Sequence, residues 1–153
     1  MERIREHEFL QYALRGNVPA IEFCQLIGRI SQTWDDLVDG DKPVDAQAIN
    51  RMMFAALIEL PENTFYQQHA FTLVPIIRSH IADWMAANAL EYQGIEAQRI
   101  AFVIRDNVGA IVTQCAYLIG GYEWMCEVNV AVRRHVHDEP FDEYRSNFGS
   151  KNP

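Results

Sequence analysis

The chain has 153 residues, of which 49% are hydrophobic and 22% are charged, and its formal net charge is -8. These proportions are ordinary for a globular protein, and they exclude a disordered or fibrous chain. The negative charge repels the phosphates of nucleic acid, so we expect no nucleic-acid partner. The length fits one domain, and we expect a single helical domain over residues 1–148 with a flexible tail over residues 149–153.

The most apolar segment runs from Ile100 to Tyr122, but it contains Arg105 and Asp106, which a membrane span rarely carries. We therefore expect no membrane partner. The first residues are charged and no apolar core follows them, so a signal peptide is not expected. The number of cysteines is odd and their spacing matches no zinc site, which is typical of a reducing compartment. Together these features predict a cytoplasmic protein.

Apolar residues recur at steps of three and four along most of the chain, which is the helical period. Some helix ends are also recognisable: Gly40 is expected to end one helix, Asp45 to cap the next, and Gly120–Gly121 to separate the last two. Pro75 lies inside a helical pattern, so we expect a kink or a break there. The helices are expected over residues 2–14, 19–39, 45–60, 64–90, 95–119 and 122–137, with a short turn at 141–148. The predicted fold class is all-α, a single compact helical bundle of five to six helices.

The most informative segment lies at the end of the second expected helix and reads Trp34-Asp35-Asp36-Leu37-Val38-Asp39-Gly40-Asp41. On a helix, Asp36 and Asp39 share a face with Gln32, and Asp35 is a neighbour of Asp39. Three carboxylates near a helix C-terminus repel one another and the helix dipole, and a bound Mg²⁺ or Mn²⁺ would offset both effects. Asp35, Asp36 and Asp39 are therefore predicted metal ligands. The alternative is a solvated acidic helix end with Gly40 as its cap.

This segment resembles the aspartate-rich motif, DDxxD, of class I isoprenoid synthases. In that family the motif ends a helix of an all-α fold, and its aspartates hold Mg²⁺ ions that bind a substrate diphosphate. The resemblance implies these roles for Asp35, Asp36 and Asp39, with Gln32 in the position of a preceding glutamine. The family also has longer domains, a second acidic motif on an opposing helix, and basic residues that hold the diphosphate. The second motif is not evident in this acidic chain.

Two functions stay open. The first is a protein that binds a divalent cation and a phosphorylated small molecule through the aspartate-rich helix end. The second is a non-enzymatic interaction protein whose acidic surface engages a host protein, because the segment and the helical layout are similar to small uncharacterised proteins of tailed phages and prophages. Neither function identifies a catalytic residue.

A second polar group lies on the expected helix over residues 64–90. His80 and Asp83 are three residues apart, and His69 falls near the same helical face. Pairs of this kind ligate metals in some helical bundles, although most such histidines are hydrogen-bonded or lie at a surface. We favour the second interpretation for this group.

The segment from Ile100 to Tyr122 is apolar on nearly every face, apart from a line of polar residues spaced by seven. This line contains Arg99, Asp106 and Thr113, and it either completes the aspartate site or forms an internal salt-bridge seam, which we favour. One chain of this length has few helices to surround such a segment. A homodimer would supply the missing neighbours, so we expect one.

Overall fold

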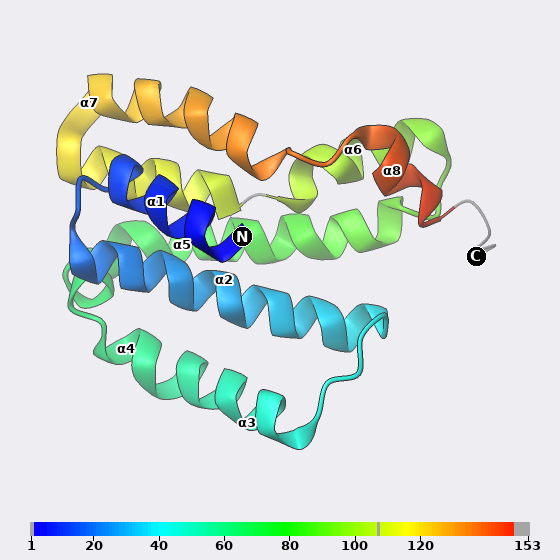
Figure 1. The fold of residues 1–153 in the computed structure, drawn as a ribbon, viewed down its shortest axis with the longest axis horizontal. Helices are drawn as coiled ribbons and strands as arrows, with labels where there is room; N and C mark the ends of the chain where they lie inside the picture. Colours follow the sequence, from blue (N-terminus) through cyan, green and yellow to red (C-terminus); the bar gives the residue numbers. More distant parts are fainter. Residues whose placement is uncertain (1, 107, 149–153) are drawn as a thin grey trace. The chain divides into compact units, whose positions relative to one another are not determined.

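The computed structural model describes residues 2–106 and 108–148, and every regular element within these ranges is helical (Figure 1). The elements are α1 (Glu2–Ala13), α2 (Val18–Asp39), α3 (Ala46–Phe54), the π-helical turn η1 (Ala55–Glu59), α4 (Leu60–Glu62), α5 (Thr64–Leu90), α6 (Ile95–Arg105), α7 (Val108–Val136) and α8 (Phe141–Ser146). Since α3, η1 and α4 follow one another without a gap, they form one continuous stretch. The predicted all-α fold of five to six helices is confirmed. None of the described helices combines the length and apolarity that a membrane crossing requires.

The chain divides into two compact units, Met1–Phe71 and Thr72–Pro153, which we call the first and the second unit. The boundary falls inside α5, close to His69, whose backbone angles (φ -119°, ψ 16°) are not helical. The single domain expected over residues 1–148 stays a prediction. The flexible tail expected over residues 149–153 lies outside the described residues.

The interruption of α5 is not where the sequence predicts it. Pro75 lies inside the helix, and the non-helical residue is His69. A proline ring meets the carbonyl group four residues before it, here that of Phe71, so its strain falls on the N-terminal side. The backbone departs from helical geometry just before that carbonyl group.

In the first unit, the loop between α2 and α3 is defined by a cap at each side. Gly40 adopts left-handed backbone angles (φ 67°, ψ 13°), and its N–H donates to the carbonyl oxygen of Asp36 at 3.1 Å. The Oδ1 of Asp45 accepts the N–H of Ala48 at 2.8 Å at the start of α3. The roles predicted for Gly40 and Asp45 are therefore confirmed.

The core of the first unit joins α2 to the stretch that follows η1. Phe23 is fully buried, and its ring centre lies 5.7 Å from that of Tyr66 and 6.2 Å from that of Phe65. The amide of Asn63 donates to the carbonyl oxygen of Pro19 at 2.9 Å, which ties the start of α2 to the end of α4. As a result, α2 and the α3–α4 stretch lie side by side in opposite directions (Figure 1).

In the second unit, α7 folds back on itself at Gly121, whose backbone angles (φ 82°, ψ -166°) are accessible essentially to glycine alone. The two arms of this hairpin lie next to each other (Figure 1). Thr113 on the first arm is buried, and its hydroxyl lies 3.1 Å from the Oδ1 of Asn129 on the second arm. The helix break predicted at Gly120–Gly121 is confirmed.

The single helix predicted over residues 95–119 is wrong, because α6 ends at Arg105 and α7 begins at Val108. Asp106 has non-helical backbone angles (φ -93°, ψ 36°), in keeping with the tendency of aspartate to bond nearby backbone groups and end helices. Arg99, Asp106 and Thr113 therefore do not share one helix, and the predicted polar line does not form. The dimer was expected because a single long apolar helix would need neighbours from a second chain, and that helix is not present in the described residues.

Candidate functional site

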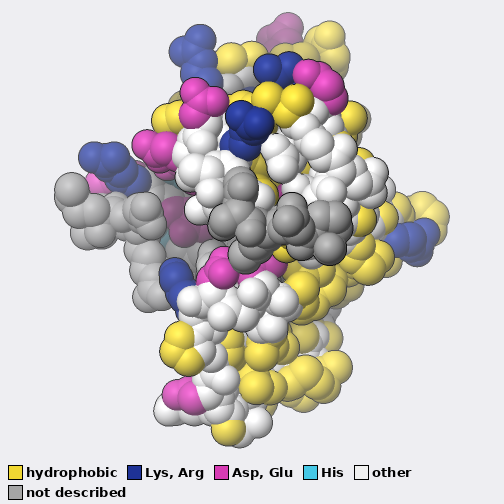
Figure 2. Space-filling view, turned by 90° about the vertical axis from the view of Figure 1, so that its right-hand side faces the viewer, with side chains coloured by type: hydrophobic (Ala, Val, Ile, Leu, Met, Phe, Trp, Pro, Cys, Tyr) yellow, Lys and Arg dark blue, Asp and Glu magenta, His cyan; other side chains and the backbone are white. Residues whose placement is uncertain are grey.

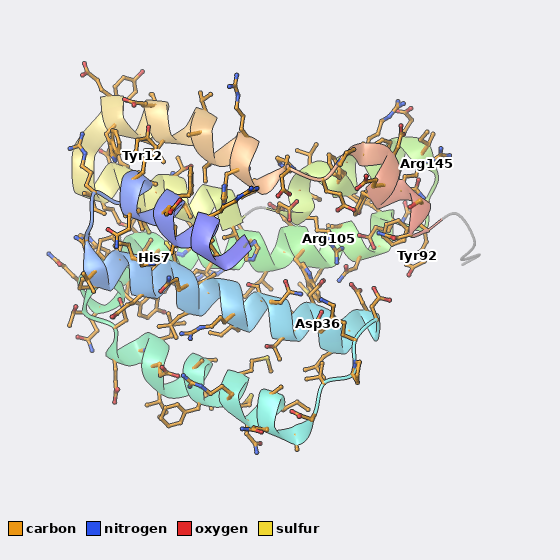
Figure 3. All side chains as sticks on the ribbon, viewed as in Figure 1. His7, Tyr12, Asp36, Tyr92, Arg105 and Arg145 are labelled. Carbon is orange, nitrogen blue, oxygen red and sulfur yellow. The ribbon has the colours of Figure 1, made fainter. Side chains whose placement is uncertain are left out.

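Asp35, Asp36 and Asp39 lie in the last turns of α2, and Figure 3 shows Asp36 on this part of the helix. The Nε2 of Gln32 donates to the Oδ1 of Asp36 at 3.1 Å, as their spacing of four residues allows. Asp39 is exposed, whereas Asp35 and Asp36 are half-buried. Among the described residues, no three His, Cys, Asp or Glu side chains are grouped to hold a metal ion. A cation at this helix end would therefore take further ligands from outside these side chains.

A hollow of about 250 Å³ lies beside this segment, in the seam between α2 and α3. Its polar lining comes from Arg29, Gln32 and Thr33 on α2 and from Arg51 on α3. Apolar side chains complete the lining: Ile30, Ala48, Met52 and Ala55. Gln32 lines this hollow and also donates a hydrogen bond to Asp36. The predicted metal ligand Asp36 therefore lies next to a hollow that is lined by two arginines.

Arg29 also lines a second hollow of about 390 Å³, whose other charged residues are Glu22, Glu59 and Glu62. Arg51 pairs with Glu59, and the hydrogen bond between them lowers the pKa of Glu59 and raises the pKa of Arg51. The positive charge of Arg29 lowers the pKa of Glu59 further. The seam between α2 and the α3–α4 stretch therefore carries fixed charges of both signs at neutral pH.

The second unit contains a buried polar cluster that the sequence does not predict. Arg105, labelled in Figure 3, pairs with the carboxylate of Glu91, and its Nη1 donates to the Oδ1 of Asn88 at 2.9 Å. The hydroxyl of Tyr144 donates to the Oε1 of Glu91 at 2.6 Å. The side chains of Glu91 and Arg105 are only 4% and 16% exposed. Donors on two residues thus satisfy the buried carboxylate, as a charge removed from water requires.

The surroundings of Tyr144 favour a structural role for this cluster. Burial raises the pKa of Tyr144 far above its ordinary value of 10.0, and the hydrogen bond to Glu91 raises it further, so the hydroxyl keeps its proton. The ring of Phe102 lies 5.1 Å from that of Tyr144 and 5.5 Å from that of His137. Partial burial raises the pKa of Asp106, whose Oδ2 lies 3.7 Å from the Nδ1 of His137. These contacts hold α8 onto α6 and the end of α5.

His80 lies in α5 with Asp83 one turn further on, and it is only 6% exposed. Burial lowers the pKa of His80, and the negative charge of Asp83 opposes this effect. The Nδ1 of His80 has no hydrogen-bond partner among the residues that the structure describes. His69 belongs to the first unit and His80 to the second, and the described residues contain no group of three potential metal ligands.

Comparisons with protein-family models, with curated proteins and with solved structures found no match for this chain. The candidate site is therefore defined by geometry alone, as Gln32 and Asp36 beside Arg29 and Arg51. The sequence predicts the first pair because helical spacing relates them. The sequence analysis identifies neither arginine. Arg29 lies three residues before Gln32, so helical spacing could have placed it on the same face, whereas Arg51 comes from another helix and no spacing relates it to Gln32.

Proposed function

We propose that this chain binds a phosphorylated small molecule together with a divalent cation, Mg²⁺ or Mn²⁺, beside the C-terminal half of α2. The observation that carries the proposal is the position of Gln32. Its amide donates to Asp36, and its side chain lines the hollow that Arg29 and Arg51 also line. A cation at Asp36 and a phosphate at the two arginines would therefore occupy adjoining parts of one surface.

The chemistry of each group supports this arrangement. Mg²⁺ is commonly held by one or two carboxylates and completes its shell with water and phosphate oxygens, so Asp36 with Asp35 or Asp39 would suffice. A guanidinium group offers paired N–H donors to a phosphate and stays charged at physiological pH. The apolar part of the lining, which includes Ile30 and Met52, would contact the rest of the ligand.

The test uses Mn²⁺ and inorganic pyrophosphate, alone and together, and follows the melting temperature and the heat of binding. A ligand present at about one hundred times its Kd adds about 2.7 kcal/mol to the stability of the folded state. We expect the mixture to raise the melting temperature by more than the sum of the two separate shifts, because the cation would bridge a carboxylate and a phosphate.

Two variants separate the parts of the site. Arg29→Gln should remove the response to pyrophosphate, and Asp36→Asn should remove the response to Mn²⁺. The matched control is Arg99→Gln, since Arg99 is an exposed arginine of the second unit that pairs with Glu96. The proposal fails if the wild-type protein shows no shift, or if both variants respond as the control does. The non-enzymatic alternative, an acidic surface that engages a host protein, would then be the better proposal.

A further inference from the structure

A hollow of about 410 Å³ lies between α6 and α8 in the second unit, and its volume falls within the range of small-molecule sites. Its described lining is polar: Gln98 comes from α6, and Asp142, Arg145 and Ser146 come from α8. Figure 2 shows the end of the molecule on which α8 lies in Figure 1, and basic and acidic side chains are both exposed in the upper part of this view. None of the four residues belongs to the proposed ligand site, which lies in the first unit.

Both walls of this hollow are attached to the same residue, Glu91. The Nε2 of Gln98 donates to the backbone carbonyl oxygen of Glu91 at 2.9 Å, and the hydroxyl of Tyr144 donates to its carboxylate at 2.6 Å. The rings of Phe102 and Tyr144 also pack together, with their centres 5.1 Å apart. The walls are therefore held in place by contacts within the chain, and a ligand does not have to order α8 in order to bind.

The hollow carries one charge of each sign, and the two do not neutralise each other. Asp142 and Arg145, the latter labelled in Figure 3, are three residues apart on α8, a spacing that permits an ion pair. Within the part of the chain that the structure describes, neither side chain has an ion-pair or hydrogen-bond partner. Both are exposed, so a solute can reach them. Ser146 donates its hydroxyl to the carbonyl oxygen of Glu143 at 2.6 Å, which leaves its oxygen as an acceptor, and Gln98 likewise keeps its Oε1.

We propose that this hollow binds a small zwitterion, a free α-amino acid with a short polar side chain. Arg145 would bind the carboxylate, since a guanidinium offers paired N–H donors to it. Asp142 would bind the ammonium group, together with the acceptor oxygens of Gln98 and Ser146. A zwitterion matches one charge of each sign, whereas a phosphate would be repelled by Asp142 and a simple amine would leave Arg145 without a partner. The polar lining offers little contact to a large apolar side chain.

The experiment measures dissociation constants by NMR titration with L-serine and with two molecules that each keep one of its charges. Ethanolamine lacks the carboxylate, and lactate lacks the ammonium group. We expect both to bind at least about tenfold more weakly than L-serine, because each loses a hydrogen bond between charged groups. The amide signals of Gln98 and Ser146 should move during the titration with L-serine, which locates the ligand in this hollow.

Two substitutions separate the charges of the protein. Arg145→Gln should weaken the binding of L-serine at least about tenfold and change that of ethanolamine little, because ethanolamine has no carboxylate. Asp142→Asn should weaken the binding of L-serine in the same way and change that of lactate little, because lactate has no ammonium group. Arg78→Gln is the matched control, since Arg78 is an exposed arginine of the second unit outside the hollow, and it should bind L-serine as the wild type does.

Circular dichroism checks that each variant keeps its helical content. The proposal is overturned if L-serine moves no signal of the wild type, or if ethanolamine or lactate binds as tightly as L-serine. It is also overturned if Arg145→Gln and Asp142→Asn bind L-serine as the control does. Because these ligands and variants differ from those that test the proposed function, the failure of one proposal leaves the other intact.

Discussion

The hydroxyl of Tyr144 lies 2.6 Å from the carboxylate of Glu91, 53 residues earlier in the chain. Arg105 reaches the same carboxylate from α6. The end of α5, α6 and α8 therefore meet at one buried charge. Because α8 has only six residues and a helix of that length is not stable alone, it depends on this contact and on the packing of Phe102 against Phe141 and Tyr144.

Replacing Arg105 with methionine would leave the carboxylate of Glu91 buried without its cation. Removing one partner of a buried ion pair costs about 3–5 kcal/mol, and urea unfolding of Arg105→Met should show a loss of that size. The double variant Arg105→Met/Glu91→Gln should recover most of it, because no charge is then unpaired and the introduced glutamine still accepts from Tyr144. A double variant as unstable as the single one would contradict this account.

Tyr144→Phe removes one donor to Glu91 and keeps the aromatic ring. A hydrogen bond to a charged group contributes about 1.5–3 kcal/mol, so the free energy of unfolding at neutral pH should fall by that amount. Tyr122→Phe is the control, since Tyr122 is 71% exposed and its hydroxyl should matter by less than about 0.5 kcal/mol. Equal effects of the two substitutions would rule out the buried hydrogen bond.

The same tyrosine predicts a loss of stability in alkali. Burial raises the pKa of folded Tyr144 above its ordinary value of 10.0. As the pH rises through 10.0, the unfolded chain therefore loses this proton first, and the folded state becomes less stable relative to it. Unfolding free energies measured on both sides of this pH should fall more steeply for the wild type than for Tyr144→Phe. Parallel curves would count against the raised pKa.

His80 should make the fold sensitive to acid. Burial lowers the pKa of His80 below its ordinary value of 6.5. As the pH falls through 6.5, the unfolded chain takes up a proton before the folded chain does, so stability drops until folded His80 is also protonated. His80→Gln should lack this drop, whereas His7→Gln, at an exposed position, should keep it. Urea titrations over this pH range distinguish the two variants.

Gly121 and Gly28 should respond to alanine in opposite directions. The backbone of Gly121 (φ 82°, ψ -166°) costs other residues about 1–3 kcal/mol, so Gly121→Ala should destabilise the protein by that amount. Gly28 lies inside α2, where an added methyl group would meet the Oε1 of Glu6 at an ordinary 3.7 Å. Gly28→Ala should therefore stabilise by about 0.5–1 kcal/mol. A neutral result at Gly121 in thermal unfolding would contradict the hairpin geometry.

Helix ends that depend on one local residue are predictable from the sequence. Gly40, Asp45 and Gly121 act within a single turn, through left-handed backbone or a capping carboxylate, so their residue types are sufficient signals. The break at Asp106 lacks a glycine or proline, and the apolar period continues on both sides of it. The break in α5 lies at His69, six residues before Pro75, so the position of the proline alone does not locate it.

In the candidate site, too, contacts within one helix are predictable from the sequence and contacts between helices are not. Asp36 and Gln32 are neighbours on one helix, so their spacing predicts the contact between them. Arg51 reaches the hollow from another helix, and Glu91 meets Tyr144 only after the chain has turned several times. Such contacts depend on how helices pack, and no local pattern of residues encodes them.

The π turn at Ala55–Glu59 is a place where the chain is expected to tolerate the loss of one residue. A π turn closes its hydrogen bonds over five residues where an α-helix uses four, so it accommodates one residue more. A codon gained or lost inside a regular α-helix rotates everything that follows by about 100°, because each turn holds about 3.6 residues. Loss of one codon within η1 would instead return the turn to α geometry while α4 and the start of α5 keep their phase. The coding sequence of these five residues is therefore where this helix can shorten without exchanging its buried and exposed faces.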